Sequence, residues 1–387
     1  MLTHGGSGHL ILLRMMQFPA LLCLFAQGPM PDDFRAYLAH VQEMVESAGD
    51  KDTMIFEMAK TWAAAKQWPQ AMEWLRKVAA LKVGLDPARD RAFAELLGTR
   101  EFEEIEAEVR AATPPVSHSR RAFAVSEGDL APESMAYDSA GKRFYFGSMR
   151  KGKILSCSVS GKCAQFAGGL GVVLGVKVHD GGLWILNNMD GEAALIHYEL
   201  KSGRVVRKYA VTGAGHTFND LAFAPAGEIY LTDTRAGAVW RLANRDAELA
   251  RMPGEFPSAN GIAVSGDGLL YVSTFGDGIR VVDLKTGAGR ALGHPDDLCL
   301  GAVDGLYFYR GGLIGIQNGF MTPRVVRMFL GRDGRAVERF EVLERRNPLF
   351  EGVTTGVVVG DQFFYMANIQ DEKREGFRPI VILRVRL

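Results

Sequence analysis

The sequence predicts a mainly-β fold, a six-bladed β-propeller preceded by a small α-helical domain. From Arg121 onward, short apolar strands alternate with turns that carry glycine, such as SAGK, HDGG and SGDG. In addition, three similar segments recur along the chain, and their leading polar residues, Asn219, Asn260 and Asp304, lie 41 and 44 positions apart. A period of about 40–50 residues with several short strands in each unit is typical of a propeller.

The repeats divide the second part of the chain, residues 121–387, into six units. Cutting at the predicted inner strands gives blades near 130–165, 170–212, 216–254, 257–294, 301–346 and 352–387. We expect the strand Arg121–Ser126 to complete the last blade and thereby close the ring without free edges. A seventh blade would need about forty more residues.

Residues 29–112 are expected to be helical, and residues 113–120 to form a linker because of their Pro, Ser and charge content. The sequence Pro31-Asp32-Asp33 is a helix start signal. The segment AKTWAAAKQWPQAMEWLRKVAAL predicts two amphipathic helices about a short turn, and it resembles a degenerate tetratricopeptide repeat (TPR-like). Its tryptophans are interpreted as core of this domain rather than as a ligand-binding box: Trp62, Trp68 and Trp74.

Residues 1–28 are interpreted as a secretory signal peptide. Arg14 precedes a short apolar run, MMQFPALLCLFAQG, which is too short to span a bilayer. Ala26 suits the last position before cleavage, whereas Leu24 is large for its position. The alternative is an amphipathic helix packed on the next domain. We expect export, to the periplasm or out of the cell, and no membrane span.

Charge and cysteine content restrict the partners. Lys+Arg and Asp+Glu each number 45, so no basic surplus indicates nucleic acid as a partner. Cys157 and Cys163 flank the predicted turn in CSVSGKC, where they either pair in an oxidising compartment or remain two buried thiols. Cys299 has no evident mate, and no CxxC motif indicates a zinc site.

Polar residues at the start of the predicted inner strands form the candidate site. Glu133 lies 86 positions before Asn219, about two repeats away. Because inner strands line the central channel, we expect Glu133, Asn219, Asn260 and Asp304 to meet at one mouth of it. Two carboxylates and two amide oxygens favour one hard divalent cation, Ca²⁺ above Mg²⁺ or Mn²⁺. Each residue alone would fit a turn, so the prediction depends on their common register.

These residues also carry a family resemblance. PESMAYD, TFNDLAFAPAGEIYLTDT, SANGIAVSGDGLLYVS and VDGLYFYRGGLIGI resemble, in order and spacing, the SMP-30/gluconolactonase-like six-bladed propellers, a superfamily that includes paraoxonases and strictosidine synthase-like proteins. The resemblance covers roughly residues 121–387. It implies that Glu133, Asn260 and Asp304 are metal ligands and that Asn219 contacts the substrate or the metal. Two positions depart from the family, Thr217 in place of an arginine and Ser134 in place of a glycine, and both bear on which lactone is bound.

The resemblance implies a metal-dependent hydrolase that acts on a small-molecule lactone or ester, with Asp304 as the base. His216 is a candidate substrate contact and His179 a further candidate, although both fit ordinary loop or strand histidines. The alternative function is a non-catalytic propeller with a structural ion that binds a ligand, or a protein partner through the helical domain. A metal-free condensing enzyme of the strictosidine synthase type, with Glu351 as its glutamate, ranks last.

Overall fold

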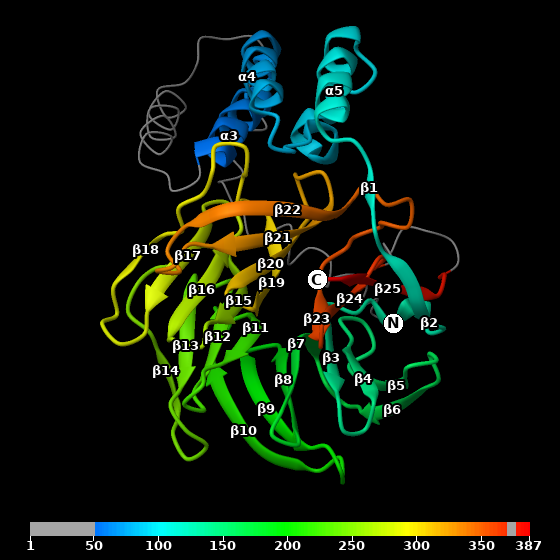
Figure 1. Cartoon of the computed structure of the whole chain (residues 1–387), viewed down its shortest axis with the longest axis vertical. Coiled ribbons are helices and arrows are strands. Elements are labelled where there is room, and N and C mark those ends of the chain that lie inside the picture. The colour runs from blue at the N-terminus through cyan, green and yellow to red at the C-terminus, as the bar shows by residue number, and fades with distance from the viewer. Residues whose placement is uncertain (1–50, 370–376) are drawn as a thin grey trace, which may run out of the picture.

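The structure is a computed structural model, and it describes residues 51–369 and 377–387. Six β-sheets are arranged in a ring, and a group of helices lies against one side of that ring (Figure 1). The six-bladed β-propeller predicted from the sequence is therefore confirmed. The predicted signal peptide and the first part of the predicted helical domain lie outside the described residues. None of the described helices is long and apolar enough to cross a membrane.

The helical part packs a single apolar stripe of each helix inward. Its elements are α3 (Lys51–Ala64), α4 (Trp68–Leu81), the short 3₁₀ turns η2 (Pro87–Arg89) and η3 (Arg91–Leu96), and α5 (Arg100–Ala112). In α5, Phe102, Ile105 and Val109 are buried, a spacing that places them on one face of the helix. The three tryptophans of the predicted TPR-like segment pack against this core, as expected: Trp62, Trp68 and Trp74.

Each blade is an antiparallel sheet whose strands follow one another in the sequence. Blades 1 to 3 comprise β3 (Ser134–Asp138), β4 (Arg143–Gly147), β5 (Ile154–Ser158) and β6 (Cys163–Ala167); β7 (Val172–His179), β8 (Gly182–Met189), β9 (Glu192–Glu199) and β10 (Val205–Thr212); and β11 (Phe218–Phe223), β12 (Ile229–Asp233), β13 (Ala238–Leu242) and β14 (Leu249–Arg251). Blades 4 to 6 comprise β15 (Ala259–Val264), β16 (Leu269–Thr274), β17 (Gly278–Asp283) and β18 (Gly289–Ala291); β19 (Val303–Tyr309), β20 (Gly312–Gln317), β21 (Arg324–Leu330) and β22 (Val337–Arg345); and β23 (Gly356–Val359), β24 (Gln362–Met366) and β25 (Ile380–Arg386). These boundaries agree with the six repeat units expected from the sequence.

The ring is closed by a strand from the beginning of the propeller. The strand β2 (Arg120–Val125) pairs antiparallel with β25, with Phe123 opposite Ile382. The prediction that this segment completes the last blade is thus confirmed. A short strand just before it, β1 (Val116–Ser117), pairs with β22, so part of the predicted linker lies in the sheet of blade 5.

Apolar side chains fill the spaces between neighbouring blades. Between blades 2 and 3, for example, Trp184 and Leu195 pack against Phe218 and Leu231, and all four are at most 1% exposed. Burial of each such side chain contributes about 1.5–3 kcal/mol. The first strands of successive blades also contact one another around the ring, in the order β3, β7, β11, β15, β19, β23 and back to β3. These contacts hold the starts of the inner strands in fixed positions.

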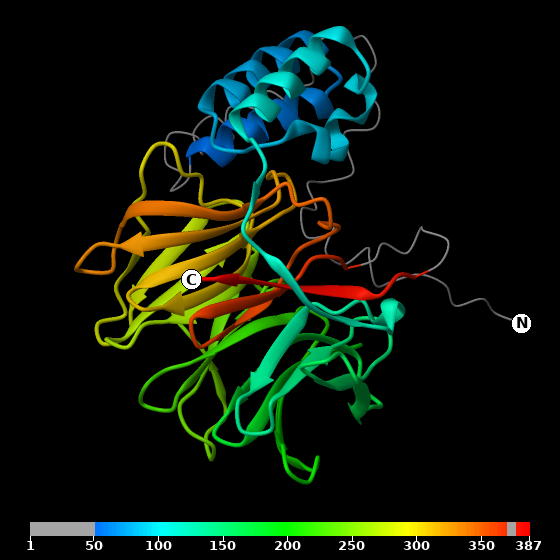
Figure 2. The same cartoon turned by 45° about the vertical axis from the view of Figure 1, so that its right-hand side comes forward.

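The helices dock on the loops of blades 4 and 5 (Figure 2). Phe56 of α3 stacks on Phe320, with ring centroids 5.3 Å apart. Leu85 forms an isolated antiparallel bridge with Met321. The helical residues, together with Cys299, Phe320 and other loop residues, form one continuous apolar cluster. The helices are therefore packed against the propeller and not merely tethered to it.

Two of the cysteines are paired. Cys157 and Cys163 lie opposite each other on β5 and β6 and form a disulfide. This resolves the alternative left open by the sequence in favour of the bridge. Cys299 is buried, and its sulfur lies 3.6 Å from the Thr53 hydroxyl of α3.

Candidate functional site

A bulge near the start of the inner strand recurs in blades 2 to 5. In blade 3, Phe218 pairs with Asp233 and Leu221 pairs with Leu231, so two residues between them bulge from the ladder. The register shifts at the same point in the other three blades. A bulge redirects side chains away from the regular alternation of a strand. The bulged residues are, in order, Leu174-Gly175, Asn219-Asp220, Asn260-Gly261 and Asp304-Gly305.

The second bulge residue lies against the next inner strand. A Cβ atom on Gly261 would lie 2.4 Å from Asp304 O, and one on Gly305 would lie 2.9 Å from Thr354 O. A Cβ on Gly175 would lie 2.8 Å from Asn219 O. Glycine at these positions therefore lets successive inner strands approach closely enough to bring the first bulge residues together.

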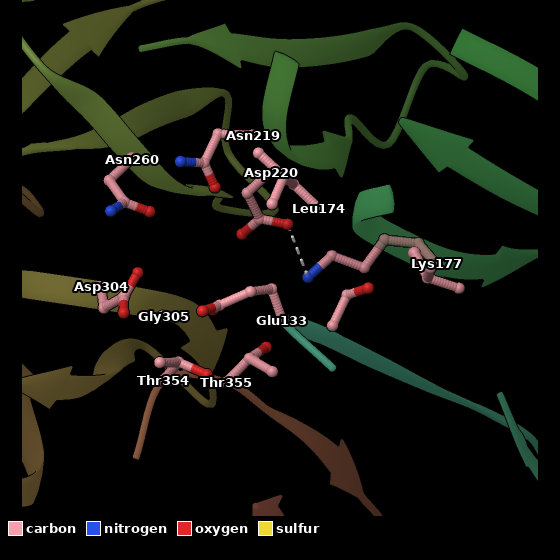
Figure 3. Close-up of a pocket in the computed structure, with 12 residues that line it drawn as sticks. Glu133, Leu174, Lys177, Asn219, Asp220, Asn260, Asp304, Gly305, Thr354 and Thr355 are labelled. Carbon is pink, nitrogen blue, oxygen red and sulfur yellow. Dashed lines mark ion pairs between the residues drawn. The ribbon is translucent and has the colours of Figure 1, made fainter. Parts of the chain in front are cut away.

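The residues predicted from the repeat register line one cavity at this level of the ring. It is lined by Glu133, Ser134, Leu174, Val176, Lys177, Asn219, Asp220, Asn260, Asp304, Gly305, Thr354 and Thr355. Figure 3 shows that the carboxylates of Glu133 and Asp304 and the amide oxygens of Asn219 and Asn260 point toward a common space. The structure thus brings together all four residues of the predicted metal set, from four different blades.

Blade 6 contributes a residue at the equivalent position. In several blades, the residue two positions before a cavity residue has a left-handed backbone conformation. In blade 6 this residue is Gly352, and the cavity residue is Thr354. The corresponding residues of the other blades are Ala131 before Glu133, Ser258 before Asn260 and Ala302 before Asp304. The sequence pattern did not predict Thr354 as a site residue, because threonine is neither an acid nor an amide. The strand–turn–strand pattern of the repeat nevertheless marks its position.

A lysine also reaches the cavity. Lys177 of β7 has its Nζ 3.2 Å from Asp220 Oδ1 and 5.0 Å from the ring centre of Tyr307. The repeat pattern does not predict Lys177, because blade 2 lacks the leading polar residue. Asp220 accepts a hydrogen bond from the backbone N–H of Leu221 over 2.8 Å and also lines the cavity. The ion pair joins blades 2 and 3 at the edge of the site (Figure 3).

The carboxylates of the site destabilise one another's ionised forms. Burial raises the pKa of Glu133 well above its ordinary value, and the nearby Asp304 carboxylate raises it further. Burial likewise raises the pKa of Asp304 to about 6, although hydrogen bonds from Asn318 and Asn260 oppose this. Two carboxylates held together in this way favour a bound proton or a bound cation over two free negative charges.

Hydrogen bonds from neighbouring groups orient the candidate ligands. Asn219 Nδ2 donates to Thr234 Oγ1 over 2.9 Å, which leaves its carbonyl oxygen for the cavity. Asn318 Nδ2 donates to Asp304 Oδ2 over 2.6 Å and to Val353 O over 2.8 Å. The repeat pattern does not predict the role of Asn318, because its contact with Asp304 depends on packing between strands.

The donor set fits a hard cation. The hydroxyl of Ser134 lines the cavity, is buried, and has no hydrogen-bond partner among the described residues. A buried polar oxygen without a partner requires water or a ligand. No group of three or more His, Cys, Asp or Glu side chains in residues 51–369 and 377–387 is arranged to hold a metal. The candidate set is instead a mixture of carboxylate and amide oxygens, which suits Ca²⁺ rather than zinc.

Neither histidine considered in the sequence lines the cavity. His216 Nδ1 lies 2.6 Å from Asp233 Oδ2, and that carboxylate is fully buried beneath it. The substrate contact expected at His216 stays a prediction, since the structure pairs its ring with the buried Asp233 and does not include it in the cavity lining. His179 stacks on Phe223 at the far end of β7, with ring centroids 4.0 Å apart. Glu351 pairs with Arg378 and does not line the cavity either.

Comparisons with known proteins extend the description of the fold. No family model and no curated protein matches the chain. Among solved structures, a candidate gluconolactonase studied by the Northeast Structural Genomics Consortium is 17% identical, with a TM-score of 0.52 over 71% of this chain and 93% of its own. The similarity establishes a shared fold.

Two further structures show how widely this fold is used. A PQQ-bound aldose sugar dehydrogenase from Streptomyces coelicolor is 16% identical, with a TM-score of 0.51 over 70% of this chain and 99% of its own. A streptogramin B lyase is 15% identical, with a TM-score of 0.51 over 68% of this chain and 96% of its own. Since these propellers carry different activities, the function has to be argued from the site.

Proposed function

We propose that this protein is a divalent-metal-dependent hydrolase that acts on a lactone or ester carbonyl, with the metal at the mouth of the propeller channel. The observation that carries the proposal is the convergence of Glu133, Asn219, Asn260 and Asp304 on one cavity. These residues come from four blades, so only the closed ring brings them together. Their oxygens would hold the ion.

The charge of the cavity matches a divalent cation. Glu133, Asp220 and Asp304 contribute three carboxylates, and Lys177 pairs with Asp220. The ionised cavity thus keeps two uncompensated negative charges, on Glu133 and Asp304. One divalent ion would neutralise both. Among such ions we propose Ca²⁺ first, because it accepts mixed carboxylate and amide oxygens in flexible geometry, with Mg²⁺ or Mn²⁺ as alternatives.

The hydrolytic chemistry assigns a role to each residue. A bound cation of this kind acts as a Lewis acid toward a carbonyl oxygen. Asp304 would accept the proton of the attacking water, because its carboxylate lines the cavity beside the place where the ion would lie. Asn219, whose amide is fixed by Thr234, would contact the substrate or the ion. Lys177, whose Nζ lies 5.0 Å from the ring centre of Tyr307, adds a cationic side chain to the cavity lining.

The proposed substrates are lactones or esters in general and not sugar lactones in particular. The propeller fold is shared with a candidate gluconolactonase, which supports a lactonase-type reaction. Thr217, however, stands where the lactonase branch often carries an arginine, and it is buried. An aldonolactone would therefore lack that arginine contact. We propose a less polar lactone or ester as the substrate.

Export is part of the proposal. The Cys157–Cys163 disulfide supports a periplasmic or extracellular location, because disulfides persist in oxidising compartments. Our proposal includes a small-molecule substrate and no nucleic-acid partner. A protein partner bound through the helical domain belongs to the alternative function, a non-catalytic binding module with a structural ion.

The deciding experiment is hydrolysis of a panel of lactones and aryl esters by the purified protein. We expect activity that disappears after exhaustive EDTA treatment and returns on addition of Ca²⁺. The Asp304→Asn variant should lose activity, whereas Asp246→Asn, at a solvent-exposed side chain, should retain it. Activity that survives chelation would refute the metal mechanism. Cation binding without hydrolysis of any substrate in the panel would favour the binding module.

A further inference from the structure

The loop that follows β20 contacts the candidate site on one side and the helical domain on the other. Asn318 is the first residue of this loop and is 9% exposed. Its Nδ2 donates to the carboxylate of Asp304 over 2.6 Å and to Val353 O over 2.8 Å. Val353 directly precedes Thr354, so one amide group holds cavity residues of blades 5 and 6.

The residues after Asn318 are fixed by the helical domain. The Arg89 Nε donates to Gly319 O over 2.9 Å, and the backbone N–H of Asp86 donates to Phe320 O over 2.8 Å. Phe320 also stacks on Phe56 of α3. The backbone N–H of Thr322 donates to Gly84 O over 2.7 Å. Four consecutive residues after Asn318 are thus anchored by helices or by the loops between them: Gly319, Phe320, Met321 and Thr322.

The segment that leads into Asp304 is held from the same side. A Cβ atom on Gly301 would lie 2.2 Å from Thr53 Oγ1 of α3, so the helix leaves no room for a side chain there. Gln317 Nε2 donates to Gly301 O over 2.7 Å. Ala302 follows with left-handed backbone, two positions before Asp304. Both chain segments that determine where Asp304 points are therefore packed between the helices and the ring.

We infer that the helical domain is a positioning element of the site, and that Asn318 is the positioning residue through which its docking fixes the Asp304 carboxylate. The inference rests on the proposed metal site. It assigns the helices a role in the site although none of the described helical residues lines the cavity. Groups that orient metal ligands typically affect metal affinity about 10–100-fold when they are removed.

The test is Ca²⁺ titration of the full chain by calorimetry, with thermal unfolding as a check on folding. Asn318→Ala should weaken Ca²⁺ binding by about 10–100-fold. The matched control is Asn368→Ala, because Asn368 lies in the loop after β24 as Asn318 lies in the loop after β20, and its side chain bonds to backbone groups, at Pro379 O and Val381 N. We expect the control to bind Ca²⁺ within about twofold of the wild type, at the limit of ordinary additivity error.

The contribution of the helices is tested by variants that do not touch the cavity. Phe56→Leu removes the ring stacking on Phe320, and Arg89→Ala removes the bond to Gly319 O at an exposed position where unfolding is not expected. Each should weaken Ca²⁺ binding by about two- to thirtyfold. Phe123→Leu, in the apolar cluster between blades 6 and 1, is the control for loss of a buried ring and should leave binding unchanged.

A double-mutant cycle decides whether the effect passes through Asn318. In the Asn318→Ala background, Arg89→Ala and Phe56→Leu should cause no further loss of affinity. Full additivity, or an Asn318→Ala variant that binds Ca²⁺ as tightly as Asn368→Ala, would overturn the inference and leave the proposed metal site intact. A wild-type chain that binds no divalent cation would instead defeat the proposed function, and this inference with it.

Discussion

Asn219 and Thr234 are joined by a hydrogen bond in which the Asn219 amide is the donor, over 2.9 Å. The Thr234 hydroxyl then donates to Ala259 O over 2.6 Å, directly before Asn260. The amide of Asn219 therefore has its nitrogen engaged on the blade side and its oxygen facing the cavity (Figure 3). One hydroxyl thus orients a candidate ligand of blade 3 and anchors the strand that carries a candidate ligand of blade 4.

Replacement of this hydroxyl should weaken cation binding without changing a ligand. We expect Thr234→Val to raise the Kd for Ca²⁺ by about tenfold, because the Asn219 amide can then turn. Thr274→Val is the matched control, since that buried hydroxyl donates to Gly278 O within its own hairpin. Calorimetric titration of both variants checks the prediction. Equal Kd values for the two would show that Thr234 does not orient Asn219.

Neutralising Glu133 should stabilise the ion-free protein against heat but remove the further stabilisation that the ion provides. Burial and the neighbouring Asp304 raise the pKa of Glu133, so its ionised form destabilises the ion-free protein at neutral pH. Glu133→Gln should therefore raise the Tm of the chelated protein, by about 2–4 °C for each kcal/mol of repulsion relieved. The stabilisation by Ca²⁺ should disappear in the same variant. Glu248→Gln, on the exposed surface, should change neither quantity.

Unfolding of the Glu133→Gln variant under all conditions would contradict this account. It would indicate that the ion holds the blades together, as in the binding-module alternative. Differential scanning calorimetry with EDTA and with Ca²⁺ separates the two cases.

Cation affinity should increase as the pH rises through 6. Burial raises the pKa of Asp304 to about 6 from its ordinary 3.8. The folded protein then binds this proton more tightly than the unfolded chain does. The free energy of unfolding of the ion-free protein should therefore decrease as the pH rises from about 3.8 to about 6. Because Ca²⁺ requires the ionised carboxylate, its Kd should be about tenfold higher at pH 5 than at pH 7.5. Asp304→Asn should flatten this dependence; a Kd independent of pH in the wild type would argue against Asp304 as a ligand.

The bulge glycines should be sensitive to a single added methyl group. In Gly261→Ala the new Cβ would meet the carbonyl oxygen of Asp304 at 2.4 Å, so β15 and β19 must separate. We expect a loss of about 1–3 kcal/mol in the free energy of unfolding. Weaker Ca²⁺ binding should accompany it. The control is Gly266→Ala, two residues after the end of β15. An added Cβ at Gly266 would have no atom within 4 Å, so this change should be neutral in urea unfolding.

The register of the repeats made the fold and four cavity residues predictable from the sequence. Because every blade repeats one strand order, a polar residue at the same point of several units had to lie at the same level of the ring. The register therefore predicts that four residues lie together, and all four line one cavity: Glu133, Asn219, Asn260 and Asp304. It also placed the closing strand β2 beside β25.

Contacts between blades were not predictable in the same way. Lys177 belongs to the blade whose leading position is Leu174, so the repeat pattern gave no signal for it. Asn318 and Thr234 follow second strands, where polar residues are common in turns. Their bonds to Asp304 and Asn219 arise only when the strands are packed. The contact of His216 with the buried Asp233 is likewise not indicated by the proximity of His216 to Asn219 in the sequence.

The pairing of β2 with β25 also has a consequence for biosynthesis. Val125 lies opposite Ile380, so the circle cannot be completed until nearly the whole polypeptide has left the ribosome. Pairings this distant along the chain are slow to form, because their loop entropy must be overcome first. During translation, β2 remains without its partner strand while five blades are synthesised. The cavity that gathers the candidate ligands can reach its final shape only after the last strand has paired.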